Sequence, residues 1–187
     1  MVRVARFLPA LALLLCTEAQ AAEPIATELK LCTSCHGGHG LPSDPTVPII
    51  WGQQAGYLQK QLNDYRDGDR DSQIMSSIAE SLSEDQVAQL SAYFGNAKWP
   101  VQSTAASPAA PGAIATCRAC HQPNLTGGVS PSGVAPRLAD QFSPYLIDTM
   151  TAYANGERAN SAVMSGLMQN LSPADRKIIA DYLAALR

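Results

Sequence analysis

The feature that most constrains this chain is a motif of two cysteines and a histidine that occurs twice in 187 residues. Cys32-Thr-Ser-Cys35-His36 recurs eighty-five positions later as Cys117-Arg-Ala-Cys120-His121. Further landmarks follow each motif in the same order, at offsets that grow to 88 and then 89 residues. In the first copy they are Pro48, Gln53, Tyr57, Gly68, Arg70, Met75 and Leu82-Ser83; in the second they are Pro136, Gln141, Tyr145, Gly156, Arg158, Met164 and Leu171-Ser172. We therefore expect one small fold built twice, with short loop insertions in the second copy.

The sequence divides into an export signal, two domains and a linker. Residues 1–22 begin with basic residues, continue with the apolar run Phe7 to Leu15 and end on small residues, which predicts a signal peptide cleaved near Ala22. The apolar run is too short to span a membrane, and the residue before Cys16 is Leu15, which disfavours lipid attachment. We expect a soluble periplasmic protein with a first domain at 23–98, a Pro-, Ala- and Ser-rich linker at 99–112 and a second domain at 113–187.

Helix signals dominate both copies. A short helix is expected to run into each cysteine pair, and a middle helix to start near Gln54 or Ser143. The last helix of each copy begins after a serine cap, Ser83 in the first and Ser172 in the second. No segment is convincing as a strand, so the fold class is all-α, with two tandem domains. A domain of roughly 80 residues buries little apolar surface alone and usually needs a cofactor as part of its core.

The repeated motif predicts that cofactor. Cys-x-x-Cys-His is the attachment pattern of c-type heme, in which two thiols bond to the porphyrin and the adjacent histidine ligates the iron. We therefore expect two covalently bound hemes. A zinc ribbon is disfavoured by the 81 residues between the pairs and by export, and a thioredoxin-like site by the missing βαβ pattern. Disulfides would not explain a histidine after each pair.

Histidine is too scarce to supply both ligands of both irons. The chain has only His36, His39 and His121, and His39 lies too close to His36 to reach the opposite face of the same heme. A loop role is expected for His39. Methionine is therefore the expected sixth ligand, and it raises the reduction potential relative to a second histidine. Such a pair of irons has no open position for a substrate.

Four methionines follow the signal peptide. Met75 and Met164 each precede a Leu-Ser helix start by seven residues and are the natural ligands. Met168 is the rival for the second heme, whereas Met150 lies on an apolar helix face and is expected in the core. The carbonyls of Pro48 and Pro136 are candidates to accept a hydrogen bond from the histidines, the alternative being that the prolines only shape the loop. Arg70 and Arg158 are candidates to neutralise heme propionates, the alternative being ordinary solvated arginines.

These motifs resemble the diheme cytochromes c4, a family of two fused class I cytochrome c domains, over essentially the whole mature chain. The resemblance implies iron ligation by His36 with Met75 and by His121 with Met164, and hydrogen bonds from the histidines to the carbonyls of the two prolines. It also implies periplasmic transfer of electrons from respiratory donors toward terminal oxidases, with the two hemes facing each other across the domain interface. Two positions depart from the family pattern: Gln122 follows His121 where the family has glycine, and Asp140 stands where the first copy has Gly52.

Charge and length narrow the function. Residues 23–98 carry ten acids and five bases, and residues 108–187 carry five acids and six bases, so the molecule is expected to be dipolar and to dock with charged redox proteins. Neither nucleic acid nor a small-molecule substrate is expected as a partner. We expect an electron carrier rather than an enzyme, because no segment is left for a catalytic domain. The alternatives are a dedicated subunit of a periplasmic sulfur-compound dehydrogenase and a diheme peroxidase.

Overall fold

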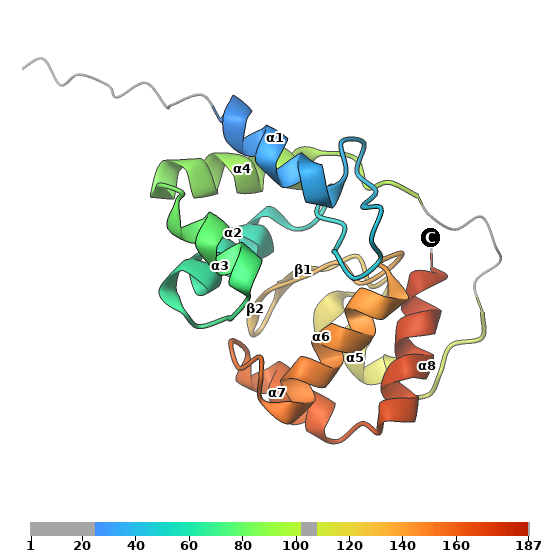
Figure 1. The fold of residues 1–187 in the computed structure, drawn as a ribbon. Coiled ribbons are helices and arrows are strands. Elements are labelled where there is room, and N and C mark those ends of the chain that lie inside the picture. Colours follow the sequence, from blue (N-terminus) through green and yellow to red (C-terminus); the bar gives the residue numbers. More distant parts are fainter. Residues whose placement is uncertain (1–24, 102–107, 187) are drawn as a thin grey trace, which may run out of the picture.

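The protein folds into two groups of four helices with a small hairpin between them (Figure 1). The computed structural model describes residues 25–101 and 108–186; the predicted signal peptide and part of the predicted linker lie outside these ranges. The all-α prediction is confirmed. The first group contains α1 (Ala26–His36), α2 (Ala55–Asp67), α3 (Gln73–Glu80) and α4 (Glu84–Asn96). The second group contains α5 (Ile114–His121), α6 (Ser143–Asn155), α7 (Ala162–Gln169) and α8 (Pro173–Ala184). None of the helices in the described ranges is long and apolar enough to cross a membrane.

Helix boundaries follow local sequence chemistry in both copies. Ser83 and Ser172 form the predicted capping boxes, in which the serine hydroxyl accepts the backbone N–H three residues later while that residue's side chain accepts the serine N–H. The middle helices end at Gly68 and Gly156, which have φ values of 81° and 83°. Glycine adopts this left-handed conformation without the steric cost of a side chain, so both helices stop at matched places.

The hairpin is the one element that the sequence did not indicate. Strands β1 (Gly128–Ser130) and β2 (Gly133–Ala135) pair antiparallel, within the longer loop between His121 and Pro136. The expectation of no strand was wrong here, because three-residue strands leave no usable period and the pairing is made within an insertion. The hairpin contacts the first copy: a Cβ on Gly56 of α2 would lie 3.1 Å from Cγ2 of Val134. Glycine at this position therefore allows β2 to approach α2.

Equivalent residues hold the two copies together in a reciprocal arrangement. Gln141 donates from Nε2 to the Ile49 carbonyl at 3.0 Å and accepts from the Ile49 N–H at 3.0 Å. Gln53, its counterpart in the first copy, donates to the Arg137 carbonyl at 3.0 Å and accepts from the Arg137 N–H at 2.6 Å. Ile49 and Arg137 are themselves equivalent positions. The interface therefore has approximate twofold symmetry, and each glutamine satisfies two backbone groups of the other copy.

Removing one of these glutamines should weaken the whole molecule. We expect Gln141→Ala to lower the free energy of unfolding by about 1–3 kcal/mol, because it leaves the N–H and C=O of the buried Ile49 without partners. Denaturant unfolding of the heme-loaded protein measures this, with the exposed Gln169→Ala as the control. An unchanged midpoint in Gln141→Ala would show that water satisfies the backbone of Ile49 equally well.

The start of the predicted linker is packed between the copies. Trp99 is only 8% exposed; its indole N–H donates to Oδ2 of Asp140 at 3.3 Å, and its ring lies 4.5 Å from the Arg137 guanidinium. Asp140 has φ of 63°, close to the 69° of Gly52, and both backbone N–H groups donate to the last helix of their own copy. The aspartate therefore keeps a glycine-like backbone despite the strain, and its side chain binds the tryptophan.

Gln122, the second departure from the family pattern, behaves in the same way. Its φ of 71° matches the positive φ of Gly37 at 85°, the residue that follows the other histidine. Its side-chain amide donates to the Val129 carbonyl at 3.0 Å and so holds β1. Both departures retain the backbone shape of the first copy and add a side-chain contact.

Candidate functional site

A cavity of about 800 Å³ runs through both copies and brings the predicted site residues together. Its walls are mainly apolar, and all eight predicted heme-binding residues line it. These are Cys32, Cys35, His36 and Met75 from the first copy and Cys117, Cys120, His121 and Met164 from the second. The sequence therefore selected residues that share one space, although they come from α1, α3, α5 and α7.

The two histidines are oriented by proline carbonyls. Nδ1 of His36 lies 2.8 Å from the Pro48 oxygen, and Nδ1 of His121 lies 2.9 Å from the Pro136 oxygen. A carbonyl can only accept, so Nδ1 carries the proton and Nε2 keeps its lone pair. Burial lowers the pKa of both imidazoles, although the bond to the carbonyl opposes the shift. Both rings are therefore neutral at neutral pH, with Nε2 available as an iron ligand.

Burial raises the pKa of two of the four cysteine thiols in the motifs. Burial raises the pKa of Cys32 to about 11 and also raises the pKa of Cys117. Both thiols are therefore uncharged at neutral pH, which suits an apolar wall. No disulfide joins the cysteines in the described part of the chain.

Met75 and Met164 occupy the same place in their copies. Each is the third residue of an eight-residue helix, and its N–H donates to a serine cap, Ser72 at 3.3 Å and Ser161 at 3.4 Å. Met168 lies about one turn further along α7 and is 4% exposed within the apolar cluster of the second copy. Met150 belongs to the same cluster, as predicted.

Two arginines lie where the copies meet: Arg158 is buried and Arg70 is half-buried. The backbones of Arg70 and Arg158 form an isolated antiparallel bridge, and each guanidinium lies 4.5 Å from a tyrosine ring of its own copy. Both donate to Oε1 of Gln61, at 2.8 and 2.6 Å. The expectation of solvated arginines was wrong for Arg158, which is 4% exposed, because packing against the other copy covers it. The sequence showed the match between the two arginines but not this burial.

This arginine pair places two positive charges on the wall of the cavity. Nη1 of Arg158 is buried and has no hydrogen-bond partner among the described residues. Burial opposes ionisation of Tyr145, yet Arg70 and Arg158 lower the pKa of this tyrosine to about 7. An unmatched buried cation is costly, so the cavity is suited to a ligand that brings anionic groups to this point. A heme, with an apolar ring and two carboxylates, has that composition and fits the residues present.

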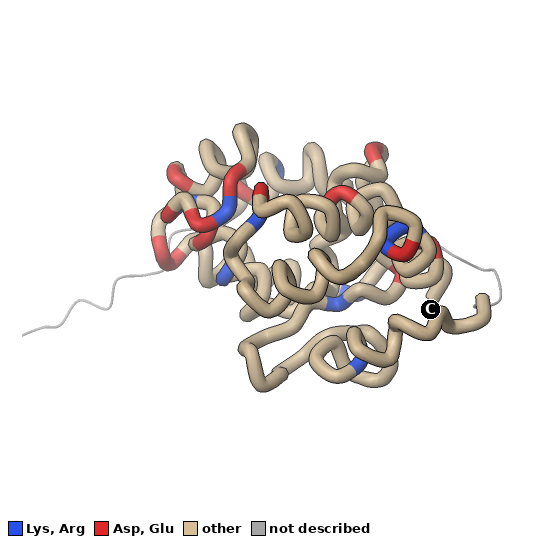
Figure 2. The backbone as a smooth tube through the Cα atoms, turned by 90° about the horizontal axis from the view of Figure 1, so that it is seen from below, with Lys and Arg blue, Asp and Glu red and all other residues tan. Residues whose placement is uncertain are grey.

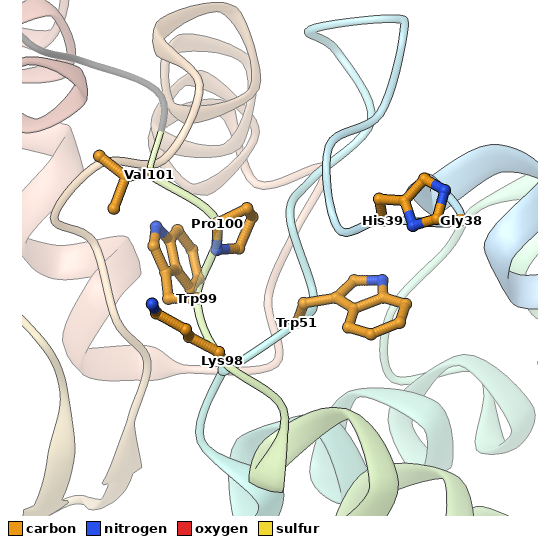
Figure 3. A pocket seen from close by; sticks show the side chains of 7 residues that line it. All are labelled: Gly38, His39, Trp51, Lys98, Trp99, Pro100 and Val101. Atoms are coloured by element: carbon orange, nitrogen blue, oxygen red, sulfur yellow. The ribbon is translucent and has the colours of Figure 1, made fainter.

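His39 lies apart from this cavity. It is exposed in the turn after α1, which agrees with the loop role expected for it. It lines a shallow depression of about 500 Å³ formed with Trp51 and with residues 98–101, and Figure 3 shows its ring beside Gly38. The His39 side chain is therefore not among the residues that surround the two cysteine motifs.

Comparison with known proteins agrees with this site. The family model described as cytochrome c matches residues 113–187. Cytochrome c4 of Thiocapsa roseopersicina is 31% identical, over 89% of this chain and 94% of that protein. A thiosulfate dehydrogenase electron acceptor of Stutzerimonas stutzeri is 30% identical, over 92% of this chain and 90% of that protein. The structure of Acidithiobacillus ferrooxidans cytochrome c4 has a TM-score of 0.71 at 31% identity, over 83% of this chain and 98% of that one.

The fold and the site define a diheme c-type cytochrome of the class I type, an electron carrier with two covalently bound hemes c. Two helical domains surround one cavity, and each brings its own cysteine motif to it. The chain belongs to the cytochrome c4 family.

Proposed function

We propose that this cytochrome is a periplasmic shuttle, without enzymatic activity of its own, that carries electrons from respiratory or dehydrogenase donors to an acceptor such as a terminal oxidase. The observation that carries the proposal is the single cavity, in which two equivalent sets of heme-binding side chains lie within one interface. In this proposal the partners are redox proteins, and there is no small-molecule substrate.

Each heme is assigned four residues of its own copy. Cys32 and Cys35 would hold the first heme and Cys117 and Cys120 the second, and the iron-binding side chains would be His36 with Met75 and His121 with Met164. When bound, heme c supplies an iron that gains and loses one electron. The proline carbonyls hold the ring of each histidine in one orientation, with Nε2 left free to bind iron. The methionine thioethers would favour ferrous iron, and a ligand set of one histidine and one methionine would leave no place for a substrate.

The pair of Arg70 and Arg158 is assigned to the heme propionates. Arg158 has an unused donor at Nη1, and both guanidiniums line the cavity, so carboxylates placed there would be neutralised out of water. Because Arg70 and Arg158 come from different copies, this charge pairing would also tie heme binding to the domain interface.

The remaining assignments concern the signal peptide, the two domains and the linker between them. A signal peptide cleaved near residue 22 would place the protein in the periplasm, although it lies outside the described residues. The domains are proposed at 23–98 and 113–187, with 99–112 as the connection. The buried Trp99 supports a connection whose first residues are fixed to both copies.

The test is an optical spectrum of the protein expressed with heme-maturation machinery, combined with a pyridine hemochrome assay and intact mass. We expect two covalent hemes per chain, the weak red band of methionine-bound ferric iron, and reversible reduction without peroxide turnover. Hemes that lack this band and turn over peroxide would instead identify an open-site enzyme.

A second candidate is supported by one comparison. Because a relative of 30% identity is named a thiosulfate dehydrogenase electron acceptor, this chain is also a candidate acceptor for such a dehydrogenase. Copurification of a catalytic subunit from the native source would select that function, and an isolated monomer would favour the free shuttle.

A further inference from the structure

The two copies share a fold but differ in the charge of their outer loops. Six acidic side chains lie exposed on the α2–α3 and α3–α4 connections and at adjoining helix ends of the first copy: Asp67, Asp69, Asp71, Glu80, Glu84 and Asp85. The equivalent residues of the second copy are Asn155, Glu157, Ala159, Gln169, Pro173 and Ala174. Only one of the six charges is therefore kept. Figure 2 shows most of the acidic backbone positions gathered at the end of the molecule that is far from the C-terminus.

Exposed apolar side chains lie on the same copy at the edge of the heme cavity. Ile74, on α3, is 67% exposed, and Leu31, on α1, is 47% exposed, yet both line the cavity. Their counterparts in the second copy are Val163, which is 47% exposed, and Thr116. The opening of the first copy is thus the more apolar one, and Asp71 lies three residues before Ile74.

We propose that this outer face of the first copy, made of Leu31, Ile74 and the six acids, is the docking surface for a redox protein with a lysine-rich face. The proposal rests on the proposed electron-transfer function. Opposite charge steers a partner from a distance, and the apolar centre excludes water once the surfaces meet. The bases of α1 and α2, Lys30, Lys60 and Arg66, do not balance the six acids. Lys60 pairs with Asp64, which is not one of the six, and Arg66 lies 3.2 Å from Asp67 alone.

The proposed docking surface lies beside the heme cavity, which shortens the path for electron transfer. A partner seated on Ile74 lies next to the α3 helix that carries Met75, so the path from the partner to the first heme is short. The second copy has an equivalent but less apolar opening, and it keeps only one of the six acids, at Glu157. A basic partner therefore exchanges electrons through the first heme in preference to the second.

The test compares matched charge removals in the heme-loaded protein. The probe is a reduced, lysine-rich mitochondrial-type cytochrome c, mixed by stopped flow at about 10 mM ionic strength, where charges act over a long range. Asp69→Asn with Asp71→Asn should slow electron transfer about fivefold. Asp148→Asn with Glu157→Gln removes two exposed charges from the second copy and should change the rate by less than about twofold.

Four outcomes decide the proposal. Slowing of the first double variant alone, lost when salt is raised, supports it. If both double variants slow electron transfer equally, the rate depends on net charge and not on where the charges lie, which overturns the proposal. A larger effect of the second pair, or none of either, also overturns it.

Two further measurements separate docking from electron transfer itself. Uncharged hydroquinone should reduce the wild type and the two charge variants at one rate; if it cannot reduce the wild-type hemes, the proposed electron-transfer function fails, not merely the docking face. At high salt, Ile74→Gln should still slow the reaction with the basic cytochrome, whereas Val163→Gln should not. Equal effects of these two substitutions would contradict an apolar centre on the first copy.

Discussion

Replacing both Cys117 and Cys120 with alanine should leave one covalent heme per chain and unfold most of the second domain. Helices α5 to α8 contain roughly half of the helical residues in the described chain, and their inner faces line the cavity that the heme would fill. A domain of about 75 residues buries too little apolar surface to remain folded around an empty cavity. Circular dichroism should therefore lose about half of its helical signal, and hemochrome and intact mass should report one heme.

Ala119→Ser is the matched control, because it gives the second motif the serine that the first has at Ser34 and keeps both cysteines. It should retain two hemes and the full helical signal. If the second domain of the double alanine variant is intact without its heme and unfolds cooperatively, its apolar cluster alone is sufficient to keep it folded, and the prediction is wrong. The apolar cluster of the second copy is larger than that of the first, so this domain is a stringent test of the prediction.

Replacing Met164 with alanine should lower the reduction potential of the second heme by on the order of 0.1 V and remove its share of the methionine band. The thioether favours ferrous iron, so its loss shifts the balance toward the ferric state. Met75→Ala should act in the same way on the first heme, since both residues occupy the third position of a serine-capped helix. Potentiometric titration followed by absorbance measures both changes.

Met168→Ala separates the two methionines of α7. Met168 is 4% exposed in the core, so truncation should cost about 2–5 kcal/mol of stability while both potentials and the methionine band persist. If Met168→Ala loses the band and Met164→Ala keeps it, the ligand assignment of the second heme is reversed.

Much of the fold follows from the sequence because it depends on neighbours along the chain. The capping boxes at Ser83 and Ser172, the Gly68 and Gly156 helix ends and the spacing from each histidine to its proline are local features. The motifs also select side chains that line one cavity, since each thiol pair and histidine share a helix turn. The sequence by itself thus determined the helical class, the repeat, the hemes and the candidate ligands.

The tertiary structure alone decided how the two copies meet. The reciprocal bonds of Gln53 and Gln141, the burial of Trp99 against Asp140 and the joined backbones of Arg70 and Arg158 connect residues about 40 to 90 positions apart. No periodicity or capping pattern encodes contacts at such separation, because they depend on the orientation of two finished domains. For the same reason, matched arginines that look solvated in the sequence come to line the cavity, with Arg158 buried and Arg70 half-buried.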